Sequence, residues 1–174
     1  MSIWFQVWSW NVTSEEEKET FPCDKYAPVK FRGMLRGINV LASANVVFRW
    51  ICQLKLAPYS YDWIDNGGRQ SPRKLTPGVE RLELGQNFLI GRIVEFEGGS
   101  HITCVIPEIN FIICPMSITF AVRSTGLKSS RIIVKIDVGY GNILEKIRGS
   151  LLAVGDLIMM RKQLNTIKEL AELE

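Results

Sequence analysis

Acidic, tyrosine and histidine side chains are the first residues to consider, because they can transfer protons. Tyr61, Asp62 and Asp65 lie in one irregular stretch, residues 57–78 (APYSYDWIDNGGRQSPRKLTPG), and the single histidine, His101, follows later. Such groups serve acid/base catalysis when they meet in a pocket. These four side chains are therefore the candidate catalytic residues, if the protein is an enzyme.

The same stretch holds three large aromatic residues, Tyr59, Tyr61 and Trp63. They alternate in sequence, so in an extended segment two of them point one way and the third points the other way. They could wall the mouth of a ligand pocket, offering apolar faces and hydrogen-bond donors. They could equally pack into the core and close one end of a sheet.

Two arginines accompany the two aspartates of this stretch. Asp62 and Asp65 could act as a carboxylate pair, and Arg69 or Arg73 could hold a ligand carboxylate in two-point contact. The alternative, which we prefer, is an ion-pair network that pins a long loop. His101 stands beside a glycine turn at the start of a strand, and it matters for function only if its ring faces a cavity.

The last quarter of the chain is the element that should position these residues. From residue 150 to 173 the sequence lacks proline, and apolar residues recur at alternating steps of four and three. This spacing predicts one helix with one apolar stripe. At 1.5 Å per residue the helix is roughly 36 Å long and needs an apolar surface of similar length. The stripe consists of Ala153, Leu157, Met160, Leu164, Ile167 and Ala171.

Two methionines and an aspartate flank this stripe. Met159 and Met160 are adjacent and cannot share one face, and their flexible thioethers suit either a ligand wall or core filling. We expect Asp156 to pair with Lys162 or with an arginine of residues 57–78.

A series of strands precedes the final helix. Residues 33–41 form a first strand, Ser43 caps a helix that ends before Pro58, and residues 86–96 and 101–106 form a hairpin. A shorter edge strand is expected over residues 108–114. The apolar and polar alternation in 116–123 and 131–138 predicts antiparallel strands covered on one side. A curved sheet that bends away from one long helix leaves room for a cavity between them.

Composition excludes several other classes. The chain has 174 residues, 47% hydrophobic and 22% charged, with a net charge of +3. This net charge is too small to indicate nucleic-acid binding by itself. In the 57–81 region, where basic residues lie near aromatic ones, the acidic residues nearly cancel the positive charge, which suits phosphate contacts badly. No run of about 18 apolar residues exists, and no signal peptide is evident, so we expect a cytoplasmic protein without a membrane-spanning segment.

The four cysteines are Cys23, Cys52, Cys104 and Cys114. They form no C-x-x-C pair, and one histidine cannot complete a zinc set, so we expect no metal site, no cofactor and reduced, mostly buried thiols.

Residues 1–28 should form an N-terminal arm with a short helix, followed by one domain over residues 29–174. Trp4, Trp8 and Trp10 could cap one end of the core, or they could form a lid or a dimer contact. Thr13 and Glu16 fit a capping box at the start of the short helix. The oligomeric state is expected to be monomer or homodimer.

The order of elements, with several motifs, resembles the SRPBCC superfamily. This superfamily includes START lipid-transfer domains, Bet v 1-like plant proteins and polyketide cyclase-like proteins. The likeness is strongest to a bacterial branch without a settled activity. It covers nearly the whole chain from about Thr13. The motifs are Tyr59-Ser60-Tyr61-Asp62-Trp63 with Asn66, Arg69 with Ser71-Pro72-Arg73, and Gly155-Asp156-Leu157 through Met159, Met160 and Gln163-Leu164.

The resemblance implies an α+β helix-grip (Bet v 1-like) fold, in which a curved antiparallel sheet wraps around a long C-terminal helix. It also implies a hydrophobic cavity. We expect a hydrophobic or aromatic small molecule to bind there, and a polyketide cyclase or dehydratase-like enzyme is the alternative. The expected ligand-binding residues are Tyr59, Tyr61, Trp63, Asn66, Arg69, Phe120, Met159, Met160 and Gln163.

Overall fold

The computed structural model of the chain describes residues 3–107, 114–140 and 143–174. The strand expected over residues 108–114 falls almost wholly outside this part of the chain.

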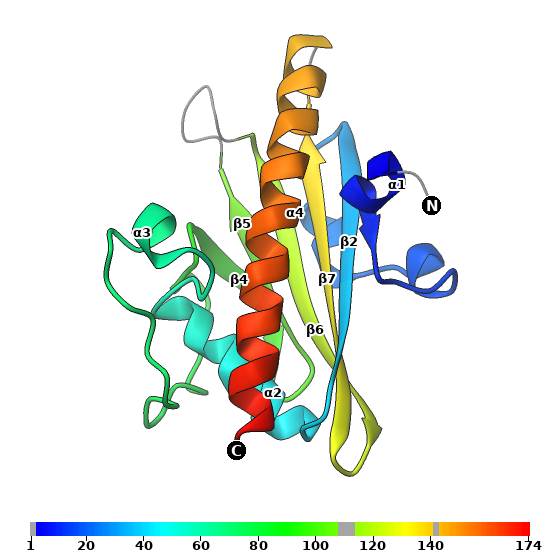
Figure 1. The fold of residues 1–174 in the computed structure, drawn as a ribbon. Coiled ribbons are helices and arrows are strands. Elements are labelled where there is room, and N and C mark those ends of the chain that lie inside the picture. The colour runs from blue at the N-terminus through cyan, green and yellow to red at the C-terminus, as the bar shows by residue number, and fades with distance from the viewer. Residues whose placement is uncertain (1–2, 108–113, 141–142) are drawn as a thin grey trace.

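The described strands form one seven-stranded sheet with the order β1-β2-β7-β6-β5-β4-β3 (Figure 1). All neighbouring strands are antiparallel except β1 and β2, which are parallel, so the sheet is mixed rather than purely antiparallel. Register shifts interrupt the β4–β5 and β6–β7 pairs, and such irregularities bend a sheet locally. The strands are β1 (Ser9–Trp10), β2 (Phe31–Val40), β3 (Asn87–Phe88), β4 (Gly91–Glu97), β5 (His101–Ile106), β6 (Met116–Gly126) and β7 (Ser129–Gly139).

Four α-helices and three short 3₁₀-helices are present among the described residues. The predicted cap of α2 is confirmed, because the Ser43 hydroxyl accepts a hydrogen bond from the Val46 N–H. The helices are α1 (Ile3–Trp8), α2 (Ala44–Cys52), α3 (Asp62–Asp65) and α4 (Ile143–Glu172), and the 3₁₀-helices are η1 (Glu16–Lys18), η2 (Pro22–Tyr26) and η3 (Gln53–Lys55).

The long C-terminal helix α4 begins earlier than the predicted residue 150. All six residues of its predicted apolar stripe are buried. Helix α4 packs most closely against α2, β2 and α1, and it runs along one face of the sheet (Figure 1). Among the strands, α4 contacts mainly β2, and residues of β5, β6 and β7 line a space between the sheet and the helix.

The opposite face of the sheet carries the N-terminal segment of residues 13–28. The Thr13–Glu16 capping box is confirmed, since each residue accepts a hydrogen bond from the other's backbone N–H. Glu16 also pairs with Arg131, and Asp24 pairs with Lys135. The sequence predicted a sheet covered on one side only. This expectation was wrong, because the polar side chains of the outer face pair with residues of this segment.

Candidate functional site

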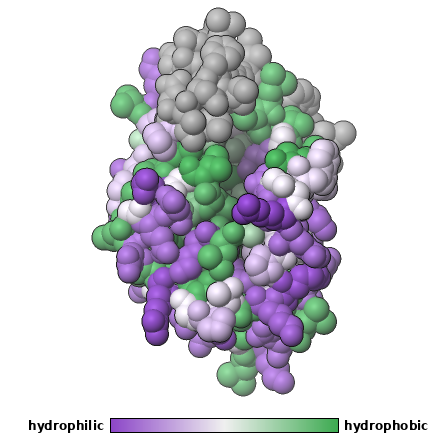
Figure 2. Space-filling model, turned by 90° about the vertical axis from the view of Figure 1, so that its left-hand side faces the viewer, coloured by the Kyte–Doolittle hydropathy of each residue, from purple (hydrophilic) through white to green (hydrophobic). Residues whose placement is uncertain are grey.

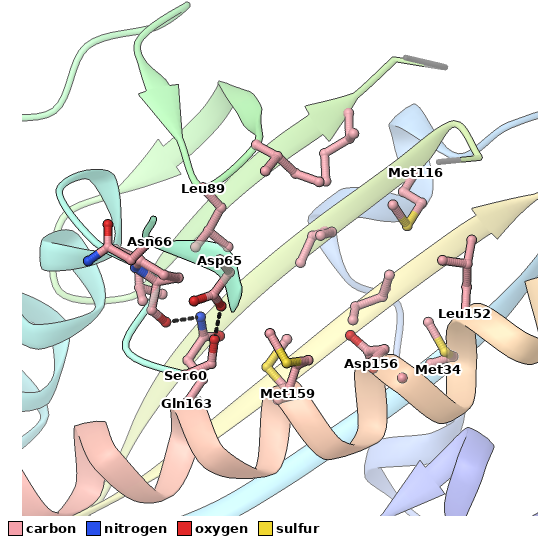
Figure 3. A pocket seen from close by; sticks show the side chains of 18 of the residues that line it. Met34, Ser60, Asp65, Asn66, Leu89, Met116, Leu152, Asp156, Met159 and Gln163 are labelled. Carbon is pink, nitrogen blue, oxygen red and sulfur yellow. Dashed lines mark hydrogen bonds between the residues drawn. The ribbon is translucent and has the colours of Figure 1, made fainter. Parts of the chain in front are cut away.

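A cavity of about 800 Å³ lies between α4, the sheet and the chain that follows α2 (Figure 3). Its walls are mostly branched aliphatic and methionine side chains. Strands β2, β5, β6 and β7 contribute Met34, Ile106, Met116, Ile118, Ile136 and Val138, and α4 contributes Leu151, Leu152, Gly155, Asp156, Met159, Met160 and Gln163.

A helical glycine keeps part of this space open. A Cβ atom placed on Gly155 would have no atom within 4 Å, although Gly155 belongs to α4 and lines the cavity. Any larger side chain at this position would therefore extend into the cavity without meeting the backbone.

The side of the cavity away from the sheet is built by residues 54–66. Figure 2 looks onto this side of the molecule and shows hydrophobic residues gathered in the middle of the face, with hydrophilic residues around them. Ser60, Asp65 and Asn66 line the cavity here. The Ser60 hydroxyl donates to the Asp65 carboxylate, so this polar edge is internally bonded.

Gln163 on α4 joins this polar edge to the helix. Its amide Nε2 donates to the Pro58 carbonyl oxygen over 2.5 Å, and its side chain lines the cavity. Pro58 can only accept at that atom, so the amide nitrogen must face it. The contact fixes the segment after α2 against α4.

A buried ion pair lies further along α4. The Asp156 Oδ2 atom accepts from Arg36 Nη2 over 2.9 Å. The Arg36 side chain is fully buried, whereas the Asp156 side chain is 22% exposed and lines the cavity. The ion pair therefore presents its acidic partner to the cavity and its basic partner to the protein interior.

Arg36 is held by more than Asp156. Its guanidinium also donates to the carbonyl oxygens of Val7, Trp8 and Leu35, at 2.8, 3.2 and 3.0 Å. Burial lowers the pKa of Arg36 and raises the pKa of Asp156, and each partner opposes the shift of the other. The arginine thus links α1, β2 and the cavity wall in one network.

Comparison with solved structures bears on the fold. A protein from Thermobifida fusca matches 82% of this chain and 95% of its own, with a TM-score of 0.54 and 12% identity. The di-domain ARO/CYC BexL of the BE-7585A biosynthetic pathway matches 82% of this chain and 47% of its own, with a TM-score of 0.53 and 15% identity. The Zhui aromatase/cyclase from Streptomyces sp. R1128 matches 82% of this chain and 94% of its own, with a TM-score of 0.50 and 15% identity.

The protein has the helix-grip fold. The same fold in these solved structures confirms the predicted fold class. No protein-family model matches the sequence, and the search of curated proteins found no match either. None of the described helices is both long enough and apolar enough to cross a bilayer.

Five of the residues predicted to form the site lie on the helix-grip cavity. They come from two parts of the chain that the fold brings together. One is the end of α3 with the residue that follows it, and the other is the middle of α4. They are Asp65, Asn66, Met159, Met160 and Gln163.

The aromatic residues of 57–78 lie outside the cavity lining. Tyr59 is buried in the core, where its hydroxyl donates to the Pro72 carbonyl oxygen and its ring packs edge-on against Trp50. Trp63 is 75% exposed on α3, and Tyr61 is only partly buried. The structure therefore separates the three rings.

Phe120 and Arg69 also lie outside the lining. Phe120 is buried against Phe88 in an edge-to-face contact. Within the described part of the chain neither Arg69 nor Arg73 forms an ion pair. The loop is pinned instead by Asp62, whose carboxylate accepts from the backbone N–H and the hydroxyl of Ser71.

His101 belongs to the other face of the sheet. Its ring lies 3.7 Å from carboxylate oxygens of both Glu95 and Glu97, while the next residue, Ile102, packs into the core. Of the four candidate catalytic residues, Asp65 lines the cavity, and Tyr61, Asp62 and His101 do not.

Sequence reasoning missed the Arg36–Asp156 pair. It predicted that Asp156 would pair with Lys162 or with an arginine of 57–78, and this was wrong. The available signal was an acidic residue beside the apolar stripe of α4 and an arginine within the apolar strand β2. These two residues are 120 positions apart, so only the packing of α4 on β2 shows that they meet.

Proposed function

We propose that this protein binds a hydrophobic or aromatic small molecule in the helix-grip cavity. The cavity carries the proposal: it measures about 800 Å³, within the range of small-molecule sites, and its walls are mainly apolar. Apolar walls without protein atoms against them lose dispersion contacts, and a hydrophobic ligand would restore those contacts.

We assign the ligand contacts to residues of both walls. Met159 and Met160 have flexible side chains that can adapt to the shape of a ligand. Asn66 and Gln163 offer amide groups at the polar edge, where they would fix the orientation of the bound molecule.

A fluorescent probe tests the proposal directly. N-phenyl-1-naphthylamine is apolar and becomes brighter when it leaves water. We expect saturable binding with one molecule per chain. In Gly155→Phe the new ring would occupy the cavity and weaken binding at least 10-fold, whereas Gly155→Ala adds one methyl group and should bind nearly as the wild type.

Two results would contradict the proposal. One is no saturable signal with the wild type. The other is equal affinity in Gly155→Phe, provided that circular dichroism shows this variant to be folded, because the probe would then bind elsewhere.

A second candidate is a cyclase-like enzyme, favoured by the likeness to two aromatase/cyclase structures. That likeness concerns the fold, and fold alone does not establish a reaction. We place this candidate second because three of the four predicted acid/base residues are not part of the cavity lining. Mass spectrometry distinguishes the binding protein from the enzyme. Molecules that co-purify with the protein from its host are released, and their masses are compared before and after they are incubated with the protein again. Loss of one water from the molecule would support the enzyme.

A further inference from the structure

We propose that the ligand of this cavity carries a neutral hydroxyl group that donates a hydrogen bond to Asp156, with Arg36 as the positioning residue. This inference rests on the proposed binding function and specifies the class of ligand: a mainly apolar molecule with a hydroxyl at the end that faces Asp156.

The two carboxylate oxygens of Asp156 are in different situations. Oδ2 is taken by Arg36 Nη2 at 2.9 Å. Oδ1 has no hydrogen-bond partner among the described residues. This oxygen is not fully buried either, because the Asp156 side chain is partly exposed. In Figure 3 the Asp156 side chain lies on the cavity side of α4, next to Met159. One acceptor oxygen is therefore available to a bound molecule.

The net charge of the pair selects a neutral donor. Arg36 already compensates the negative charge of Asp156, so an added ammonium group would leave one uncompensated positive charge in apolar surroundings. A hydroxyl adds a hydrogen bond and no charge. Hydrogen bonds to charged acceptors are the stronger ones, so the contact should discriminate between ligands.

Arg36 is fully buried, and its two Nη atoms donate to carbonyl oxygens and to Asp156, so we assign it no direct contact with the ligand. Its role is to hold Oδ2 and so to fix the direction of Oδ1. The walls nearest to Asp156 are apolar, and the next polar residue of α4 on the cavity is Gln163, roughly 10 Å along the helix. The hydroxyl end of the ligand therefore lies at Asp156, and the rest of the molecule extends toward Gln163.

The test compares 2-naphthol with 2-methoxynaphthalene by displacement of N-phenyl-1-naphthylamine. In the ether a methyl group replaces the hydroxyl hydrogen, so the donor is lost while the ring and the oxygen are kept. We expect the wild type to bind 2-naphthol about 10-fold more tightly. In Asp156→Asn, Arg36 offers only donors and must hold the amide oxygen, so the NH₂ group turns to the cavity. The preference should then disappear or reverse in favour of the ether.

The matched control is Glu169→Gln, which removes one negative charge from an exposed position of the same helix and should keep the wild-type preference. If Asp156→Asn does not fold, the double variant Arg36→Met with Asp156→Leu removes both charges together and avoids an unpaired buried charge. It should no longer bind 2-naphthol more tightly than the ether.

The outcomes separate this inference from the proposed function. If neither probe displaces N-phenyl-1-naphthylamine, or if that dye does not bind, the binding function itself fails. If both probes bind the wild type equally, or if the preference for 2-naphthol persists in Asp156→Asn, the function stands and the role of Asp156 is refuted. Tighter binding of 2-naphthylmethylamine than of 2-naphthol would refute the neutral donor.

Discussion

At the scale of single residues, the outer face of the sheet contains an unusual carboxyl group. Asp137 is fully buried, and neither of its oxygens has a hydrogen-bond partner within the described residues. The nearby amine of Lys135 pairs with Asp24 instead. Burial and the neighbouring Asp24 together raise the pKa of Asp137 to about 6, against the attraction of Lys135. The Cys23 thiol lies in the same cluster, and burial raises its pKa to about 12.

This carboxyl group should make stability depend on pH. An unfolded aspartate titrates near 3.8 and the folded one near 6, so the folded protein holds the proton more tightly. The contribution of Asp137 to the free energy of unfolding therefore falls as the pH rises from 3.8 to about 6, by roughly 2–3 kcal/mol. Asp137→Asn should be more stable than the wild type by that amount at pH 7, and the gain should shrink toward pH 4.

Urea denaturation at several pH values measures this difference. Glu169→Gln is the control, because Glu169 is exposed and the variant should show no such pH-dependent gain. A gain for Asp137→Asn that is the same at pH 4 and pH 7 would show that Asp137 is not the titrating group.

At the scale of elements, α4 has two different faces. Its apolar stripe packs into the core, and the adjacent face, including Gly155, Asp156 and Met159, lines the cavity. The two faces should respond differently to truncation, because only the first has closely packed neighbours.

Two leucines of α4 make this contrast measurable. Leu164 is fully buried, and Leu164→Ala should lower the free energy of unfolding by about 2–5 kcal/mol through lost contacts and a new void. Leu151 lines the cavity and is 71% exposed, so Leu151→Ala should change stability by less than ~0.5 kcal/mol. Denaturant titration distinguishes them, and equal losses would contradict the assignment of the two faces.

At the scale of the whole molecule, the cavity joins segments that are distant in sequence. Helix α4 forms one wall, the sheet another, and residues 54–66 the third. A ligand that contacts all three walls would bind the folded chain and not the unfolded one, so binding and folding should be coupled.

Thermal unfolding should therefore shift with ligand concentration. At a concentration of N-phenyl-1-naphthylamine 100 times its Kd, the folded state should gain about 2.7 kcal/mol, seen as a higher Tm. Gly155→Phe, with its at least 10-fold weaker binding, should gain at most about 1.4 kcal/mol at the same dye concentration. A Tm that does not change with dye concentration, although the dye binds, would mean that it also binds the unfolded chain.

The sequence by itself determined the long strands, the helix after Ser43 and the inward-facing stripe of α4. The cap at Ser43, the capping box at Thr13 and the buried stripe follow from local rules of helix geometry that hold in almost any tertiary context. Four ligand residues predicted through the superfamily resemblance also line the cavity, although whether they bind a ligand stays a prediction.

Tertiary structure decided which side chains meet. The alternation argument for the aromatic stretch assumed an extended backbone, but Tyr59 has a φ of 57° and its ring turns into the core. Arg36 and Asp156 come together only because α4 packs on β2. Periodicity describes which face of an element is apolar, whereas contacts between distant elements depend on how those faces are docked.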